Sequence, residues 1–150
     1  METLFGLPAH PLMVHAPIVL LPLAALGAII MGFSARFSVR FGPLVTAVAG
    51  VGVVTAGLAR LSGQELAETV GVSEDHLQAG DLLPFAAAGF FILVLALWLL
   101  DRRGPRNLGI QILAVVVIAA SIIIVGWVIR TGHTGAEMVW QGIGQQLTGS

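Results

Sequence analysis

The chain contains no cysteine and no lysine, and only 10% of its 150 residues are charged. Without cysteine, its own side chains cannot form disulfides, thiolate metal sites or iron–sulfur clusters. A net charge of −1 without a basic cluster argues against a nucleic-acid partner. Soluble domains carry about 25% charged residues. The composition therefore excludes an ordinary soluble domain and predicts an integral membrane protein.

Four long apolar runs fill the sequence, at residues 11–33, 43–61, 82–100 and 108–129. About 20 apolar residues span a hydrocarbon core of ~30 Å, so each run is long enough to cross a membrane. We therefore expect an all-α fold, a four-helix transmembrane bundle with up-down-up-down connections. The length suits a single integral membrane domain over residues 1–150.

Two of the helices are expected to extend beyond the bilayer on the outer side. Leu61, Leu66 and Val70 keep helical spacing after the second apolar run, and Ser73 is suited to cap the next helix. The spacing predicts helices at about 11–33, 43–70, 74–100 and 107–131. The polar segment 141–150 is predicted to be a mobile tail.

The arginines predict the orientation of the bundle. Five of the seven lie in the two loops that follow the first and third runs, while seven of the eight acidic residues lie on the opposite side. Cytoplasmic loops carry the excess of basic residues. Residues 1–9 lack the positive charge of a secretory signal peptide, so the first run is interpreted as a retained helix. We expect a multi-pass protein of the bacterial cytoplasmic membrane with both termini extracytoplasmic.

All four histidines are predicted to lie at one end of this bundle: His10, His15, His76 and His133. His15 lies about one turn inside an apolar run, where a polar ring is costly unless it is paired or bound to a ligand. His10 and His15 are five residues apart, which is roughly 140° around a regular helix. That pair alone is therefore a weak metal motif, and the candidate site depends on the whole cluster.

Two carboxylates, Glu65 and Glu137, are expected at the same end. Imidazoles with carboxylates suit zinc, copper or iron, and two imidazoles on facing helices suit a haem. Gly50 and Gly57 lie on one stripe of the second helix. The stripe allows either close helix packing or a flat groove for a cofactor ring. A proton-relay cluster or a structural cluster without a cofactor remains an alternative.

Two motifs carry a resemblance to a known family. Residues 10–18 read HPLMVHAPI, which is similar to the opening HPLLVHFPI of a family of small bacterial membrane proteins called domain of unknown function 2231. Residues 132–139 read GHTGAEMV, which resembles the closing GHxGGxLV segment of that family. Ser62, Gly63 and His76 fit its middle.

The resemblance implies four membrane helices and a suspected involvement in redox or metal chemistry, without a settled activity. Ala16 stands where the family usually has Phe, and Ala136 replaces the second glycine of the closing motif. Both departures alter packing beside the candidate site without removing a candidate ligand.

The favoured function is a b-type haem electron-transfer module or a subunit of a redox complex. His15 and His133 are the expected axial ligands, with His76 as a substitute for either. The alternative is a copper or zinc protein that uses these residues together with His10 and Glu65 or Glu137. A third possibility is a cofactor-free structural subunit. We do not expect an enzyme that acts alone, and the expected partners are the bilayer, other membrane subunits or a periplasmic electron-transfer protein.

Overall fold

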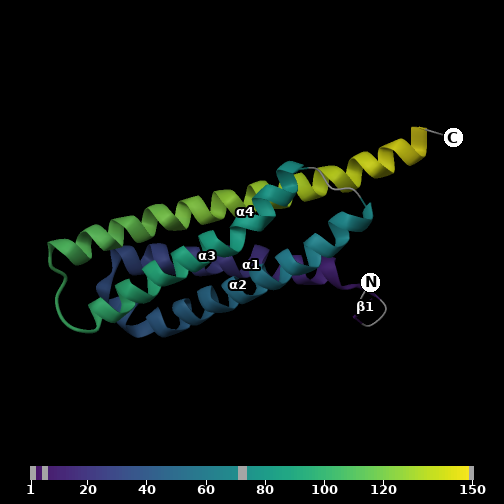
Figure 1. Cartoon of the computed structure of the whole chain (residues 1–150). Coiled ribbons are helices and arrows are strands. Elements are labelled where there is room, and N and C mark those ends of the chain that lie inside the picture. The colour runs from purple at the N-terminus through teal and green to yellow at the C-terminus, as the bar shows by residue number, and fades with distance from the viewer. Residues whose placement is uncertain (1–2, 5–6, 71–73, 149–150) are drawn as a thin grey trace.

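The computed structural model consists of four long helices that lie side by side (Figure 1). They are α1 (Ala9–Phe33), α2 (Ala35–Val70), α3 (Glu74–Asp101) and α4 (Leu108–Thr148). Before α1, the two-residue strands β1 (Thr3–Leu4) and β2 (Leu7–Pro8) pair antiparallel. The structure describes the backbone of residues 3–4, 7–70 and 74–148, and the side chains of residues 15–61 and 80–133. The predicted all-α, four-helix fold is confirmed.

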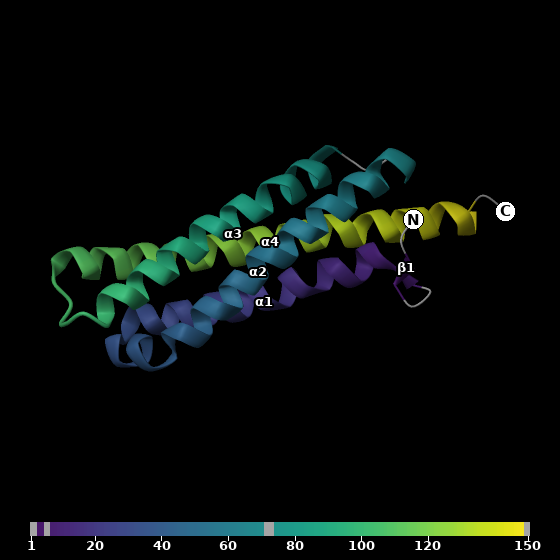
Figure 2. The same cartoon turned by 60° about the horizontal axis from the view of Figure 1, so that its bottom comes forward.

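The helices form a ring in which each one packs against its two neighbours. α1 contacts α2 and α4, and α3 contacts the same two helices from the other side, while α1 and α3 barely touch. Figures 1 and 2 show that the α1–α2 turn and the α3–α4 loop lie at the same end of the bundle. The two termini, the end of α2 and the start of α3 lie at the opposite end.

Each helix carries a segment long and apolar enough to cross a membrane. These candidate spans are His15–Phe33, Ala35–Leu61, Gly80–Asp101 and Leu108–His133. Large apolar side chains cover the outside of the bundle, for example Phe33, Leu108 and Val115. Such a surface is too apolar for water and suits a lipid environment.

The interior is built largely from small residues, so the helices approach closely. α1 contributes Ala24, Ala25 and Ala28 to the core. Bulkier side chains from the other helices fill the centre, among them Phe90, Val94, Leu97, Val117 and Ile124. Some hydroxyl groups inside the spans donate to carbonyls of their own helix, as Ser121 Oγ does to the Val117 oxygen at 2.7 Å. Such pairing removes the cost of a free hydroxyl in an apolar medium. The buried hydroxyls of Ser38 and Thr46 in α2 have no hydrogen-bond partner among the described residues.

α2 begins eight residues before its predicted start, because Ser34 caps it. The Ser34 hydroxyl accepts a hydrogen bond from the Phe37 amide at 3.2 Å, and the Ser38 amide donates to the Ser34 carbonyl at 3.0 Å. Ser34 is thus the single residue between α1 and α2. Pro43, which suggested a helix start, lies inside α2 instead. A proline there removes one backbone hydrogen bond, which the surrounding helical contacts outweigh.

α4 is longer than predicted. Its expected end near residue 131 is wrong, because the helix continues through Gly132 and Gly135 to Thr148. Most of the segment 141–150, predicted as a mobile tail, is therefore helical. Val139, Ile143 and Leu147 recur at helical spacing in this segment, and such a repeat outweighs the modest helix cost of the glycines.

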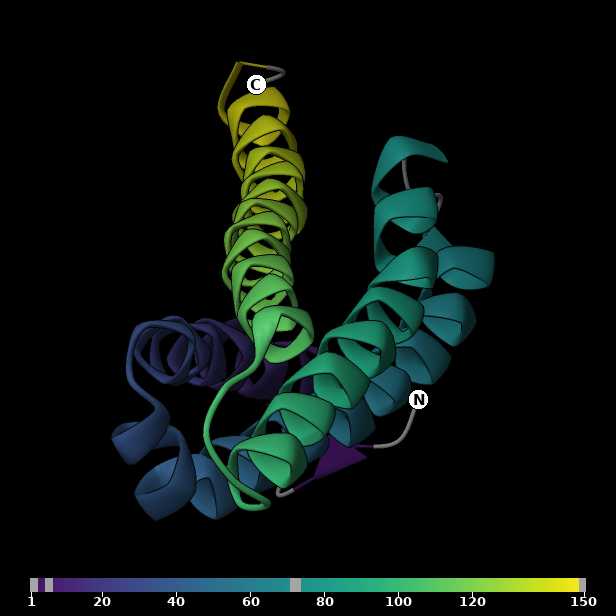
Figure 3. The same cartoon turned by 90° about the vertical axis from the view of Figure 1, so that its left-hand side faces the viewer.

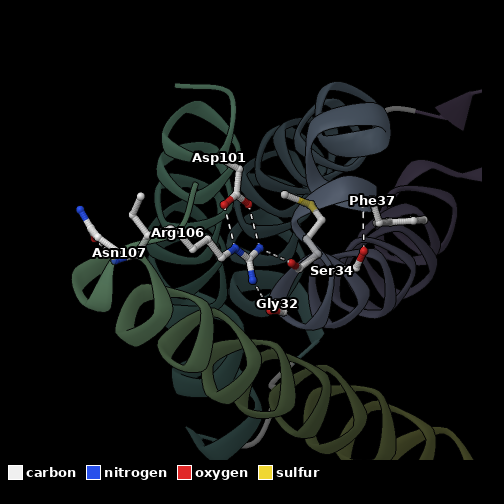
Figure 4. A network of polar contacts seen from close by, with 8 residues as sticks. Gly32, Ser34, Phe37, Asp101, Arg106 and Asn107 are labelled. Carbon is white, nitrogen blue, oxygen red and sulfur yellow. Dashed lines mark hydrogen bonds and ion pairs between the residues drawn. The ribbon is translucent and has the colours of Figure 1, made fainter. Parts of the chain in front are cut away.

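Arg106, in the α3–α4 loop, joins three helices at one point (Figure 4). Its guanidinium forms two hydrogen bonds of 2.8 Å with the carboxylate of Asp101 at the end of α3. It also donates to the carbonyl oxygens of Met31 and Gly32 in the last turn of α1. A cation at a helix C-terminus satisfies its free carbonyls and complements the helix dipole. Asn107 then caps α4 by accepting the Ile110 amide at 3.0 Å.

Replacing Arg106 with Ala should destabilise the bundle strongly. The Asp101 side chain is fully buried, and removal of one partner from a buried ion pair costs about 3–5 kcal/mol. Thermal or denaturant unfolding of the purified protein in detergent measures the loss. Arg103→Ala is the matched control, because Arg103 is an exposed arginine of the same loop. Similar stability for the two variants would contradict the structural role of Arg106.

Gly42 and Gly89 provide a second test, of the close approach between α2 and α3. A Cβ at Gly42 would overlap Cδ1 of Trp98, whereas a Cβ at Gly89 meets no described atom within 4 Å. The buried indole nitrogen of Trp98 has no hydrogen-bond partner among the described residues, so packing on Gly42 holds the ring.

Gly42→Ala should therefore lower stability by roughly 1–3 kcal/mol through overpacking. Gly89→Ala should leave stability unchanged or slightly raised, because alanine is the better helix former. The same unfolding assay in detergent measures both variants. Equal effects of the two substitutions would count against the packing described here.

Candidate histidine site

His15 and His133 lie near the ends of their membrane-spanning segments, on two neighbouring helices. His15 begins the candidate span of α1, and His133 ends that of α4. Both side chains are exposed. These are the two candidate ligands whose side chains the structure describes. The side chains of His10, His76, Glu65 and Glu137 lie outside the described residues.

The packing of α1 against α4 indicates the relative level of these two histidines. A Cβ at Gly32 of α1 would touch the side chain of Ile118 and the carbonyl oxygen of Ala114 on α4. The two helices run in opposite directions. His15 is about 17 residues before Gly32 on α1. His133 is about 17 residues after the middle of the 114–118 contact on α4, so both lie in the same direction along the bundle from that contact. At 1.5 Å of rise per residue in both helices, the two positions lie at about the same level.

α2 and α3 also pack in opposite directions, with a constant register. Gly50 of α2 meets Phe91 of α3. Nearer the histidine end, Arg60 of α2 bonds Asp81 of α3 at 3.0 Å. Both helices continue without a break toward the histidine end. Five residues after Arg60, α2 reaches position 65, and five residues before Asp81, α3 has position 76. The backbones of Glu65 and His76 therefore share one level at the same end of the bundle.

α1 is one helix from Ala9 to Phe33, so it includes both His10 and His15. The helix begins just before Pro11 and does not break between the two histidines. A five-residue offset on a continuous helix turns the two positions roughly 140° apart. The opening motif thus cannot direct both imidazoles to one point on the strength of α1 alone.

Packing differs between the two ends of the bundle. Away from the histidines, a Cβ at Gly27, Gly32 or Gly42 would lie within 3 Å of a side chain on a neighbouring helix. Nearer the histidines, a Cβ at Gly57, Gly80 or Gly132 would meet no atom of the described residues within 4 Å, although these three glycines are half-buried. The bundle is therefore tightly closed at one end and looser at the other.

The two candidate groove glycines fall on either side of this change. A Cβ at Gly50 would approach the ring of Phe91 to 3.3 Å, so this position favours the close-packing alternative. A Cβ at Gly57 would meet no described atom within 4 Å, so this position does not show the close helix packing seen at Gly50.

The Arg60–Asp81 ion pair is a feature that sequence reasoning missed. The guanidinium of Arg60 also lies 5.3 Å from the ring centroid of Phe85. Both charged side chains are partly exposed, at 33% and 42%, so the pair contributes little to stability. The sequence offered one signal for this pair: Arg60 lies at the end of the second apolar run and Asp81 just before the third. The pair marks the register of α2 and α3 close to the level of the histidines.

Within the side chains that the structure describes, no group of three or more His, Asp or Glu residues could hold a metal ion. This part of the chain contains two of the four histidines and neither Glu65 nor Glu137. A site made from the full predicted set therefore extends beyond it.

Comparison with known proteins identifies the family. No curated protein and no solved structure matches the chain significantly. The family described as "Predicted membrane protein (DUF2231)" matches residues 6–146, which include both histidine motifs and all four membrane-spanning segments. The chain therefore belongs to the DUF2231 family of predicted membrane proteins.

Proposed function

We propose that this protein binds a b-type haem between α1 and α4 and serves as an electron-transfer module of the membrane. His15 and His133 supply the axial imidazoles. A haem so held would accept and release one electron at a time. The observation that carries the proposal is the common level of His15 and His133 on adjacent helices, at the end where the bundle loosens.

The level of the histidines supports axial ligation from two helices. Two imidazoles that would hold one haem must reach the same group, which requires positions at a similar level on neighbouring helices. His15 and His133 meet that requirement along the bundle axis. His76, at the same end on α3, can replace either of them. Glu137, one turn beyond His133 on α4, is suited to accept the second N–H of an imidazole and orient its ring.

The looser packing supports a large flat group over a bare ion. Imidazole nitrogens bind a bare transition metal and a haem iron at similar distances, about 2.0–2.1 Å. The two cases differ in the room that they need, because a porphyrin ring would also occupy space beside its ligands. Among the described residues, no atom lies within 4 Å of a Cβ built at half-buried Gly57 or Gly132, which suits the larger group.

A copper or zinc site is the second candidate. The exposure of His15 and His133 favours it, because water-accessible imidazoles can exchange a metal. The shared level of Glu65 and His76 adds a carboxylate and a third imidazole. In this arrangement His10 and Glu137 belong to the outer part of the site.

The histidine end is proposed to face the outside of the cytoplasmic membrane. All four helices continue past their apolar spans at this end: α1 begins at Ala9, α2 runs to Val70, α3 begins at Glu74 and α4 runs to Thr148. The opposite end carries five of the seven arginines, as cytoplasmic loops do. An outward-facing site would exchange electrons with a periplasmic protein or with another membrane subunit.

The cofactor is tested by the absorption spectrum of the protein purified from membranes, with iron, copper and zinc measured in the same sample. The proposal predicts a reduced-minus-oxidised haem band with stoichiometric iron. His15→Ala and His133→Ala should each abolish it, and Glu137→Gln should weaken cofactor retention by about 10–100-fold. His10→Ala should have the smallest effect, because position 10 is roughly 140° around α1 from position 15.

A ligand role is separated from a structural role by His15→Met. Methionine can serve as an axial ligand, so this variant should keep a haem with a shifted band and a raised potential. A folded, colourless protein with stoichiometric copper or zinc would overturn the haem assignment in favour of the second candidate. A folded protein with neither haem nor metal would reject both.

The orientation is tested with a reporter fused after Ser150. An extracytoplasmic position of the C-terminus predicts that a periplasm-active reporter works there and a cytoplasm-active one does not. A fusion after Arg103, in the α3–α4 loop, serves as the control and should give the opposite result. Cytoplasmic activity from the Ser150 fusion would place the histidines on the wrong side for a periplasmic partner.

A further inference from the structure

The end of the bundle opposite the histidines carries almost no negative charge to balance its arginines. No Asp or Glu occurs between Glu2 and Glu65, and Asp101 is the only one between Asp81 and Glu137. Asp101 is buried and fully occupied by Arg106. The four other arginines of this end are exposed: Arg36, Arg40, Arg102 and Arg103. Together these four form the basic end.

The basic end is one surface, because the elements that carry it are in contact. Arg36 and Arg40 are one turn apart on α2, so they lie on the same side of that helix. Arg102 follows α3, and its guanidinium lies 5.2 Å from the ring centroid of Trp98. Trp98 packs directly on Gly42 of α2. Figure 3, which views this end, shows the start of α2 beside the end of α3.

Exposed aromatic rings lie directly beside these charges. The guanidinium of Arg40 lies 5.4 Å from the centroid of the Phe41 ring. Phe41 is 40% exposed, and Phe33, three residues before Arg36, is 79% exposed. The surface thus combines cationic groups with apolar groups that face the lipid. A phospholipid has the complementary arrangement, with a phosphate above acyl chains.

We propose that the basic end binds anionic phospholipid headgroups of the surrounding bilayer. Charge complementarity carries this assignment: four exposed guanidiniums, none of which forms an ion pair within the described part of the chain, face the headgroup level. Guanidinium groups bind phosphate oxygens through paired N–H donors. A free phosphate ion would use the arginines but not Phe33 and Phe41.

The opposite end provides an internal contrast. Arg60 at that end already has a carboxylate partner, Asp81, at 3.0 Å. The histidine end also carries most of the acidic residues of the sequence. Anionic lipid should therefore gather at one end of the molecule only. This inference does not depend on the identity of the cofactor.

Native mass spectrometry of the full-length protein in detergent tests the proposal. The protein is titrated with phosphatidylglycerol, cardiolipin or phosphatidylcholine. Anionic lipids should be retained at least about five-fold more strongly than phosphatidylcholine, since each arginine near the surface contributes a factor of roughly five. The paired variants R36Q/R40Q and R102Q/R103Q should each reduce this preference by about five-fold or more.

Arg130→Gln, compared with Arg103→Gln, is the matched control, because Arg130 is an exposed arginine near the histidine end. Arg130→Gln should leave the preference for anionic lipid unchanged, whereas Arg103→Gln should reduce it. Equal retention of anionic and zwitterionic lipids, or equal effects of the two single variants, would overturn the proposal. Displacement of the lipid by millimolar inorganic phosphate would show a small-anion site instead. Unfolding midpoints of each variant establish that the bundle is intact.

Discussion

The contact of Arg106 with Asp101 and the end of α1 holds the closed end of the bundle together. One guanidinium neutralises a buried carboxylate on α3 and satisfies two carbonyls that α1 cannot pair itself. In an apolar medium each of these groups would be costly if left alone. Their combination in one cluster lets three helices converge where the glycine contacts are shortest. The tight packing of Gly32 against α4 depends on this convergence.

The two ends of the bundle differ in how closely the helices pack. Close glycine contacts and the Arg106 cluster hold the helices together at one end. At the other end, a Cβ built at Gly57, Gly80 or Gly132 meets no atom of the described residues within 4 Å. A rigid closed end is a suitable base for a site at the open end, because it fixes the level of each helix there. The cofactor site proposed for the histidines therefore lies at the end of the bundle where the helices pack less closely.

The membrane-spanning segments could be predicted from the sequence because their physical signal is strong. Runs of about 20 apolar residues have few alternatives, and the family resemblance rested on motifs at both ends of the chain. The start of α2 could not be predicted as readily. Gly42 and Pro43 form a strong breaker signal, whereas the Ser34 cap that actually starts the helix is a common residue whose role depends on local geometry.

The remaining differences have similar causes. The predicted end of the last helix near residue 131 is wrong, because the helical spacing of Val139, Ile143 and Leu147 carries α4 onward. Arg106 was counted as one more basic residue of a cytoplasmic loop, because its acceptors on α1 are 74 and 75 residues away in sequence. For the histidines, the sequence predicts a shared end of the bundle. A shared level within that end requires the register of the packed helices.

The distance in sequence between Arg106 and its acceptors has a consequence for biosynthesis. α1 and α2 are separated by Ser34 alone, so they can enter the membrane together as a hairpin. The last carbonyls of α1 nevertheless remain without their final donor until residue 106 has been synthesised and α3 has brought Asp101 alongside. During that interval, water or lipid headgroups must serve these carbonyls. The contact between Arg106 and α1 therefore forms late in assembly. A chain that is truncated before Arg106, or that inserts without α3 in place, lacks this contact.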